Sequence, residues 1–401
     1  MKNLINSDTL AKYFIVSMFC LFLFFLAGLI INPQGKQASV FFLKGNNYMA
    51  DYHNVLAYSA DNNPYLHQAP KFFAEERVAP PMVFVLGKVM GRIGGPNSTF
   101  YPQMDSFAII ISTLAVLYIS IMFFMVLQNG ANFKYKQWLV FALMLSSIFM
   151  FSFERGNIIL LAAVFSSFFV FNYDNKNPLI KELAFVSLAL AAALKISPAL
   201  LGILLIEEKR DKESTRLILY GLLFFFIPFF FINGGFNNIP DWIENIKLNS
   251  AIYEYRCFPR FNFRYWLCAL NDSALKQNIH NLLAAGGLIL GVLAVLSNKF
   301  LKYKWQRLLQ LSLVLSTIFI NSGEYTGLYL FAPIILFFNE KEHTKLDIIF
   351  LFCFILLLNP YRLMDISTAL MNASASVMLI ILTIISCVEG FKNFKEKNAV
   401  V

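Results

Sequence analysis

Residues 13–31, YFIVSMFCLFLFFLAGLII, form one of the most apolar runs in the chain. A run of this length crosses the hydrocarbon core of a bilayer as an α-helix, which needs about 20 residues. Residues 46–65, NNYMADYHNVLAYSADNNPY, follow soon afterwards and are polar, aromatic and carboxylate-bearing. The order predicts a membrane helix followed by a polar segment that lies close to the membrane surface.

The composition indicates the same class of protein for the whole chain. Of its 401 residues, 58% are hydrophobic and 14% are charged, whereas soluble domains carry about 25% charged residues. The apolar runs are continuous, which favours helices over the alternating strands of a membrane barrel. We therefore expect an all-α polytopic membrane protein. The net charge of +9 does not indicate nucleic acid, because the basic residues cluster in short loops beside apolar runs.

The apolar runs predict about ten to twelve transmembrane helices. The first is read as an uncleaved span, because no A-x-A cleavage site follows it. The run 198–206 is short and follows Pro198, so it fits half a helix or one arm of a re-entrant hairpin. The candidate spans are 13–31, 106–127, 138–153, 157–172, 180–194, 198–206, 217–232, 280–297, 308–321, 326–338, 346–359 and 375–388.

Twelve crossings place both termini on one side of the membrane. The short loops on that side, together with the termini, hold 19 of the 33 Lys and Arg residues, which predicts that this side is cytoplasmic. We expect a multi-pass protein of the inner (plasma) membrane, with one integral-membrane domain over residues 1–401. Two long outer loops follow, at 32–105 and 233–279. Within the first, PPMVFVLGKVMGRIG at 80–94 is too short to span and predicts an interfacial helix.

Charged residues are absent from the middle of the predicted spans, which is unlike ion-coupled carriers. The unusual polar residues lie at the predicted outer ends, a placement that suits a substrate with a lipid tail and a polar head. Taken singly, each also fits an ordinary role, such as a turn or a snorkelling lysine. They are Asp51 and its neighbours, FERGN at 153–157, LKIS at 194–197, INSGEYTG at 320–327 and the basic loop after 217–232.

Four stretches in this order resemble integral-membrane glycosyltransferases of the GT-C class, and most closely glycosyltransferase family 87. They are DYHNVLAYSADNNPYL, FERGNIILLAAVF, LAFVSLALAAALKISPALLGILLI and NSGEYTGLYLFAPIILFF. The likeness covers about residues 50–340. It departs from the family where Arg155-Gly156-Asn157 replaces the more usual Gly-Gln before Asn, and none of the four stretches lies in the loop 233–279.

The resemblance implies a GT-C-like helical bundle with a long first extracytoplasmic loop. It also implies an inverting, metal-independent transfer of a hexose, mannose-like, from a polyprenyl-phosphate sugar to a glycolipid or polysaccharide acceptor at the outer face. Asp51 is then the general base, with Asp61 as the reserve candidate. No cofactor is implied, and the partners are the donor, the acceptor and the bilayer.

The expected substrate-binding residues are polar, aromatic or cationic side chains near the same membrane face. Arginine and lysine would stabilise the leaving phosphate, and the others would bind sugar hydroxyls or line the site. They are Tyr52, His53, Asn54, Tyr65, Arg155, Asn157, Lys195, Arg256, Arg260, Arg264, Glu324 and Tyr325.

Two alternatives stay open at this point. An O-antigen or capsule polymerase or ligase also uses lipid-linked saccharides, and its basic outer loops would match 233–279 without any need for Asp51. A lipid-linked saccharide flippase would carry out no chemistry at all. The sequence also leaves open whether Cys257 and Cys268, which share one outer loop, form a disulfide.

Overall fold

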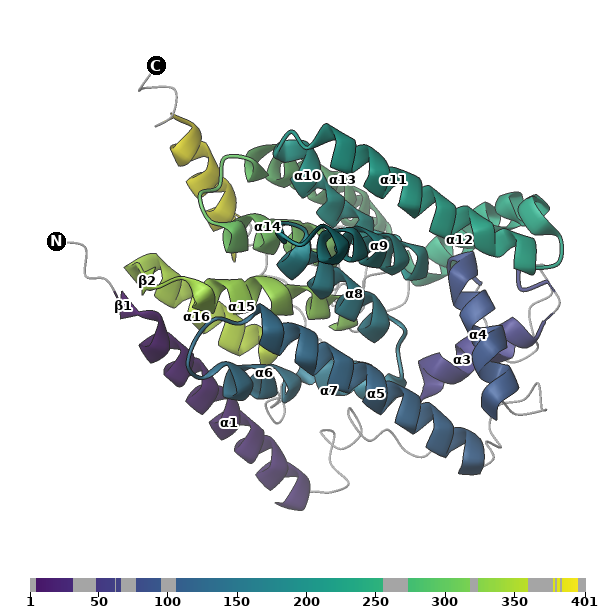
Figure 1. The fold of residues 1–401 in the computed structure, drawn as a ribbon, viewed down its shortest axis with the longest axis horizontal. Coiled ribbons are helices and arrows are strands. Elements are labelled where there is room, and N and C mark those ends of the chain that lie inside the picture. The colour runs from purple at the N-terminus through teal and green to yellow at the C-terminus, as the bar shows by residue number, and fades with distance from the viewer. Residues whose placement is uncertain are drawn as a thin grey trace. The chain divides into compact units, whose positions relative to one another are not determined.

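The computed structural model of the chain describes residues 5–31, 48–61, 63–65, 77–94, 106–254, 273–317, 324–359, 378, 381–382 and 384–395. These residues form helices and one pair of two-residue strands, which confirms the predicted all-α class (Figure 1). The chain forms two compact units. Unit 1 contains residues 1–41, 124–151 and 257–401, and unit 2 contains residues 42–123 and 152–256.

Unit 1 is organised around the first helix, which packs on three others. The N-terminal strand pairs antiparallel with a strand late in the chain, and the Ser7 hydroxyl donates to the Phe338 carbonyl at 2.6 Å. The elements are β1 (Ile5–Asn6), α1 (Ser7–Ile31), the C-terminal end of α5 (Ser106–Gly130), α6 (Lys136–Met144), most of α7 (Ser147–Arg155), α13 (Ser273–Asn298), α14 (Lys304–Thr317), η5 (Glu324–Leu330), α15 (Phe331–Asn339), β2 (Glu342–His343) and α16 (Lys345–Leu358).

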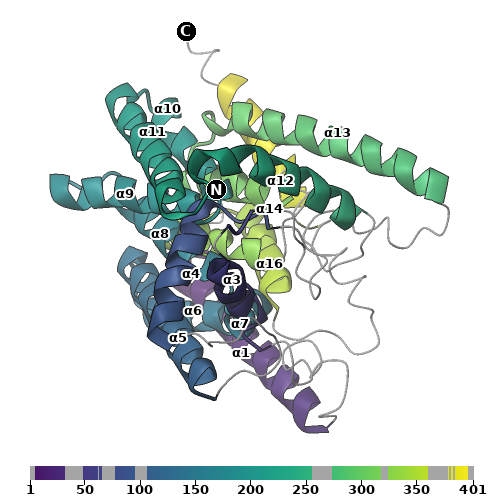
Figure 2. The ribbon, with the colours of Figure 1, turned by 90° about the vertical axis from the view of Figure 1, so that its right-hand side faces the viewer.

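Unit 2 contains the polar stretches around residues 51, 155 and 195. Its elements are α3 (Ala50–Ala60), α4 (Pro81–Gly94), most of α5, α8 (Ile159–Asn172), α9 (Pro178–Leu194), η1 (Ser197–Gly202), α10 (Ile203–Glu207), α11 (Asp211–Phe226), η2 (Ile227–Phe231), η3 (Gly235–Asn237) and α12 (Asn238–Glu254). In Figure 2, α12 lies above α3 and α4. The helix α4 matches the predicted interfacial segment, whereas the sequence did not predict α12.

The scaffold of unit 2 is the antiparallel hairpin of α8 and α9. A short turn joins the two helices, and α9 begins in a standard way: the Asn177 side chain accepts the Leu179 N–H, and Pro178 occupies the first turn. Buried alanines on both helices, such as Ala162 and Ala191, let the two backbones approach closely. Because the helices run in opposite directions, the residues just before α8 and just after α9 lie at the same end of the hairpin.

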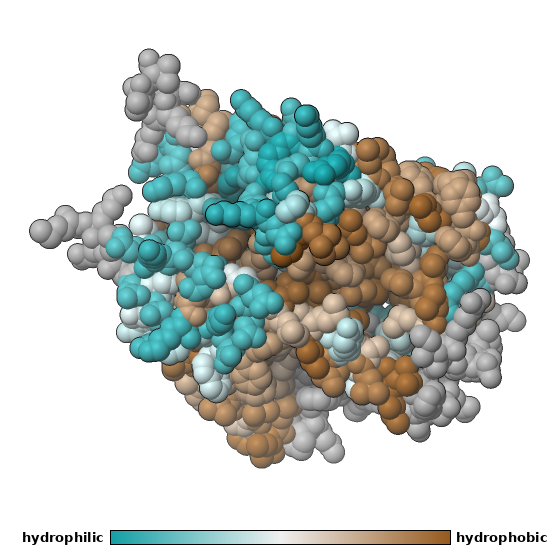
Figure 3. Space-filling view, in the orientation of Figure 1, coloured by the Kyte–Doolittle hydropathy of each residue, from teal (hydrophilic) through white to brown (hydrophobic). Residues whose placement is uncertain are grey.

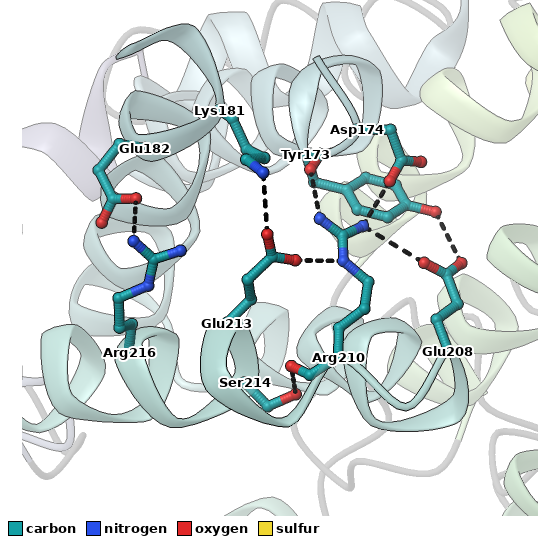
Figure 4. Close-up of polar contacts among 9 residues, drawn as sticks. All are labelled: Tyr173, Asp174, Lys181, Glu182, Glu208, Arg210, Glu213, Ser214 and Arg216. Atoms are coloured by element: carbon teal, nitrogen blue, oxygen red, sulfur yellow. Dashed lines mark hydrogen bonds and ion pairs between the residues drawn. The ribbon is translucent and has the colours of Figure 1, made fainter. Parts of the chain in front are cut away.

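A charged network closes the other end of the hairpin (Figure 4). Arg210 pairs with Asp174 and Glu213 and donates to the Tyr173 carbonyl at 3.0 Å. The Lys181 ammonium lies 2.9 Å from Glu213, so the α8–α9 turn is bound to the start of α11. The surface is hydrophilic here and becomes hydrophobic along the later part of α11 (Figure 3).

Within the described residues, three helices are long and apolar enough to cross a membrane, namely α1, α5 from Ile109 and α11 continued by η2. The pair α6 and α7 makes a fourth if it counts as one span. The span predicted at 138–153 corresponds to this pair, which is bent by 60° between the two helices. The bend coincides with Ser146, whose hydroxyl accepts the Phe149 N–H at 3.3 Å and so starts α7. Shorter apolar helices account for other predicted spans, and the total of ten to twelve crossings stays a prediction.

Candidate active site

The turn between α7 and α8 is formed by the FERGN stretch. Gly156 adopts a left-handed conformation with φ of 61°, which glycine reaches without steric cost. Its N–H donates to the Phe153 carbonyl at 3.0 Å, and the Asn157 N–H donates to the Ser152 carbonyl at 3.1 Å. These two bonds are the pair that ends a helix in a Schellman motif. The stretch therefore stops α7 sharply and starts α8 two residues later.

The first turn of α3 docks on this turn. The Met49 N–H donates to the Glu154 carbonyl at 2.7 Å, and that carbonyl lies in the last turn of α7, where helices leave carbonyl groups without a partner in the helix. A Cβ on Gly156 would lie 2.7 Å from the Met49 sulfur and 2.9 Å from the Tyr52 Cβ. The missing side chain of Gly156 therefore makes room for α3.

Docking places the Asp51 carboxylate against two donors from the turn. Arg155 Nη2 donates to Asp51 Oδ1 at 3.0 Å, and Asn157 Nδ2 donates to Asp51 Oδ2 at 2.6 Å. The side chains of Asp51 and Arg155 remain 20% and 24% exposed, so both are accessible from the surface. Asp51 also lies in the first turn of α3, where the helix dipole favours a negative charge.

Lys195 approaches the same carboxylate from the end of α9. Its backbone is extended, with φ of −149°, so the helix stops there. Burial lowers the pKa of the Lys195 ammonium, and the Asp51 carboxylate opposes that effect by stabilising the cation. Asp51, Arg155, Asn157 and Lys195 thus gather at one end of the α8–α9 hairpin, and we refer to these four residues as the Asp51 cluster.

Comparison of the chain with models of protein families identifies its family. Residues 80–379 match the model of glycosyltransferase family 87. The chain belongs to glycosyltransferase family 87. It is therefore a transferase whose family acts on sugars. A search of curated proteins found no match.

The range matched to family 87 contains three members of the Asp51 cluster, but it starts after Asp51 itself. Asp51 joins the matched part of the chain through its bonds to Arg155 and Asn157. The geometry therefore adds a residue that the family match alone does not include.

The neighbours of Asp51 on α3 divide between two faces of the helix. Residues three apart share a face, so Asn54 lies beside Asp51, whereas residues two apart point to opposite sides. The Asn54 Oδ1 atom is buried without a hydrogen-bond partner among the described residues, as are both ring nitrogens of His53. Burial lowers the pKa of His53 to about 4, so its imidazole is neutral at pH 7.

Tyr65 and Asp61 support the start and the end of the loop between α3 and α4. The Tyr65 ring is buried against Phe84 and Phe229, and its hydroxyl donates to the Ala79 carbonyl at 2.8 Å. Asp61 forms an ion pair with the buried guanidinium of Arg77. The hydrogen-bonding groups of both side chains therefore hold the ends of the loop, which is a structural role that the sequence did not reveal.

The helix α12 anchors the same part of the loop. Trp242 donates its indole N–H to the Val78 carbonyl at 3.0 Å, and the Asn245 amide donates to the Tyr65 carbonyl at 3.1 Å. These bonds fix α12 to the two ends of the loop between α3 and α4.

The remaining predicted site residues either belong to unit 1 or fall outside the described residues. Tyr325 belongs to unit 1, where its ring stacks on Phe151 with centroids 5.8 Å apart, and Glu324 begins the same short helix, η5. Within the described part of the chain, no three His, Cys, Asp or Glu side chains are grouped to hold a metal ion. Arg256, Arg260, Arg264, Cys257 and Cys268 lie outside the described residues.

Replacing Gly156 with alanine tests the docking of α3. The new Cβ would lie within 2.9 Å of Met49 and Tyr52, on a backbone of positive φ, so α3 must shift. We expect glycosyl transfer to fall by about 10²-fold, since small displacements in a positioned site cost that much. Turnover of the purified variant is the measurement.

Gly91→Ala in α4 is the matched control. No atom lies within 4 Å of the Cβ that it would add, and alanine favours a helix over glycine by roughly 1 kcal/mol. This variant should keep wild-type turnover and melt no lower than wild type. Equal turnover for the two alanine variants would show that α3 does not need the space at Gly156.

Proposed function

We propose that this family 87 glycosyltransferase transfers a mannose-like hexose from a polyprenyl-phosphate sugar to a glycolipid or polysaccharide acceptor. The reaction takes place at the outer membrane face and inverts the anomeric carbon. The observation that carries the proposal is the Asp51 cluster, in which one carboxylate lies beside two cations. A carboxylate and cations are what such a transfer needs at its nucleophile and at its leaving group.

Asp51 is the general base of the proposed reaction. A sugar hydroxyl is a poor nucleophile and must lose its proton as its oxygen bonds to the anomeric carbon. Asp51 accepts that proton, while the bond between the anomeric carbon and the phosphate oxygen breaks and its electron pair leaves with the phosphate. The two bonds of Asp51 to Arg155 and Asn157 hold the carboxylate in place, and its partial exposure supports access by the acceptor.

Arg155 and Lys195 stabilise the leaving phosphate. Both side chains are cationic, and a cation stabilises the negative charge that grows on a departing phosphate. Arg155 donates to Asp51 through Nη2, so its guanidinium lies beside the proposed base. Cations of this kind supply the charge that a metal ion would otherwise provide, and we expect the transfer to be metal-independent.

The sugar is bound by neutral hydrogen-bonding groups of α3. Buried polar atoms without a protein partner commonly bind a ligand or a water molecule. Asn54 shares the face of Asp51 and has such an atom in its side-chain oxygen. Tyr52 is the other candidate. His53 lies two residues from Asp51 and points to the other side of α3, which does not support it as a ligand of the same sugar.

The proposed orientation places the Asp51 cluster outside and the Arg210 network in the cytoplasm. The two lie at opposite ends of the α8–α9 hairpin, and α11 with η2 has 21 residues, or about 30 Å at 1.5 Å per residue. The loop 207–216 carries four Lys and Arg residues, which favours the cytoplasmic side.

Replacing Asp51 tests the base. Asp51→Asn keeps the shape and removes the basicity, so turnover should fall by about 10²–10⁴-fold with donor binding largely intact. Asp51→Glu moves the carboxylate by one methylene and should recover little. Turnover is measured with a polyprenyl-phosphate sugar at saturating acceptor.

Asp61→Asn is the matched control, because Asp61 pairs with Arg77 at the base of the loop. This variant should melt at a lower temperature and keep most of its turnover. If Asp61→Asn is inactive while Asp51→Asn is nearly normal, Asp51 is not the base.

Lys195→Ala tests the phosphate contact. A charge-assisted bond to phosphate is worth roughly 1.5–3 kcal/mol, so donor use should fall by about ten- to a hundred-fold. The comparison is Lys181→Ala at the other end of α9, which pairs with Glu213 and should leave donor use unchanged. If Lys195→Ala uses the donor as efficiently as wild type, Lys195 does not bind the donor phosphate.

Cysteine labelling tests the orientation. Ala60 and Lys212 are both exposed, and single cysteines at these positions should react from the outside and from the cytoplasm respectively. Labelling of both positions from the same side would overturn the proposed orientation of unit 2.

A further inference from the structure

The Asn157 side chain joins two parts of the site through opposite ends of its amide group. Its Oδ1 accepts the Ile159 N–H at 2.9 Å, and its Nδ2 donates to Asp51 at 2.6 Å. A backbone N–H can only donate, so the atom that faces Ile159 must be the oxygen, and the nitrogen must then face Asp51. The orientation of the amide is therefore determined by its partners.

The backbone of Asn157 is held equally firmly. Its N–H donates to the Ser152 carbonyl, and its carbonyl accepts the Leu160 N–H at 3.0 Å. Asn157 thus belongs to the end of α7 and to the start of α8 at once, and its side chain cannot move far without breaking one of these bonds. A bond from such a residue fixes the Asp51 carboxylate in direction as well as in distance.

We infer that Asn157 is a positioning residue for Asp51 and not a ligand of the substrate. The inference rests on the proposed function, in which Asp51 is the general base. Arg155 also holds Asp51 but carries a charge that the donor phosphate can attract. Asn157 is neutral, so it orients the carboxylate and adds no positive charge beside the base.

The chemistry of this position selects asparagine. The residue must accept from the Ile159 N–H and donate to Asp51 at the same time. Aspartate can accept but has no donor when ionised, and alanine has neither group. Glutamine has both groups but is longer by one methylene, so the same two atoms would not reach both partners in this turn.

Asn157→Asp separates positioning from substrate binding. The carboxylate still accepts from Ile159, and aspartate starts helices as well as asparagine does, so α8 should be preserved. Two carboxylates now lie at hydrogen-bond distance and hold a shared proton to higher pH. We expect the acidic limb of the kcat–pH profile to move upward by about one to two pH units, with little change in KM for the donor.

Two further variants keep the test interpretable. Asn157→Ala adds no charge but removes one donor to the carboxylate, so kcat should fall by about tenfold, and the acidic limb of its pH profile should move upward by less than in Asn157→Asp. The double variant Asp51→Asn with Asn157→Asp restores a donor–acceptor pair with the roles exchanged. It should melt close to wild type and remain inactive, because the carboxylate is no longer at position 51.

The Asn157 variants and Asp51→Asn separate an error in the role of Asn157 from an error in the proposed function. A raised KM for the donor in Asn157→Asp, with kcat and its pH profile unchanged, would make Asn157 a substrate ligand and overturn the inference. Wild-type turnover in Asp51→Asn would overturn the proposed base itself. An inactive Asp51→Asn together with an unshifted profile in Asn157→Asp would overturn only the role of Asn157.

Discussion

The docking of the first turn of α3 on the α7–α8 turn is the contact on which the candidate site depends. This contact is held by one backbone bond from Met49 to Glu154 and by the two bonds to Asp51. The absence of a side chain at Gly156 gives α3 the room to approach. Each interaction contributes about 1–3 kcal/mol at most, so none suffices alone. Together they fix the Asp51 carboxylate of α3 against residues more than one hundred positions later in the chain.

The α8–α9 hairpin gives this contact its rigid base. Asn157 precedes one helix and Lys195 follows the other, so antiparallel packing brings a neutral donor and a cation to the same end. The Arg210 network fastens the opposite end to α11. A site carried on packed helices holds its geometry better than one carried on loops, which agrees with the demands of a positioned general base.

The sequence predicted the class of the fold and the four residues of the Asp51 cluster, because charged or polar residues at the ends of apolar runs are conspicuous. It did not reveal that Asn157 bonds to Asp51, since that depends on the direction of an amide in a folded turn. It predicted Tyr65 as a substrate-binding residue but did not reveal that the Tyr65 hydroxyl donates to the Ala79 carbonyl. The bend between α6 and α7 was missed because the apolar run continues across Ser146. The helix α12 was missed because its polar residues read as a loop.

An experimental structure with a bound polyprenyl-phosphate sugar tests the central claim most directly. The account predicts phosphate oxygens within hydrogen-bond distance of Arg155 and Lys195, and the anomeric carbon between that phosphate and Asp51. The bond from Asn157 to Asp51 should persist in that state. A donor whose phosphate lies away from both cations would contradict the proposed site. A donor whose anomeric carbon does not face Asp51 would also contradict it.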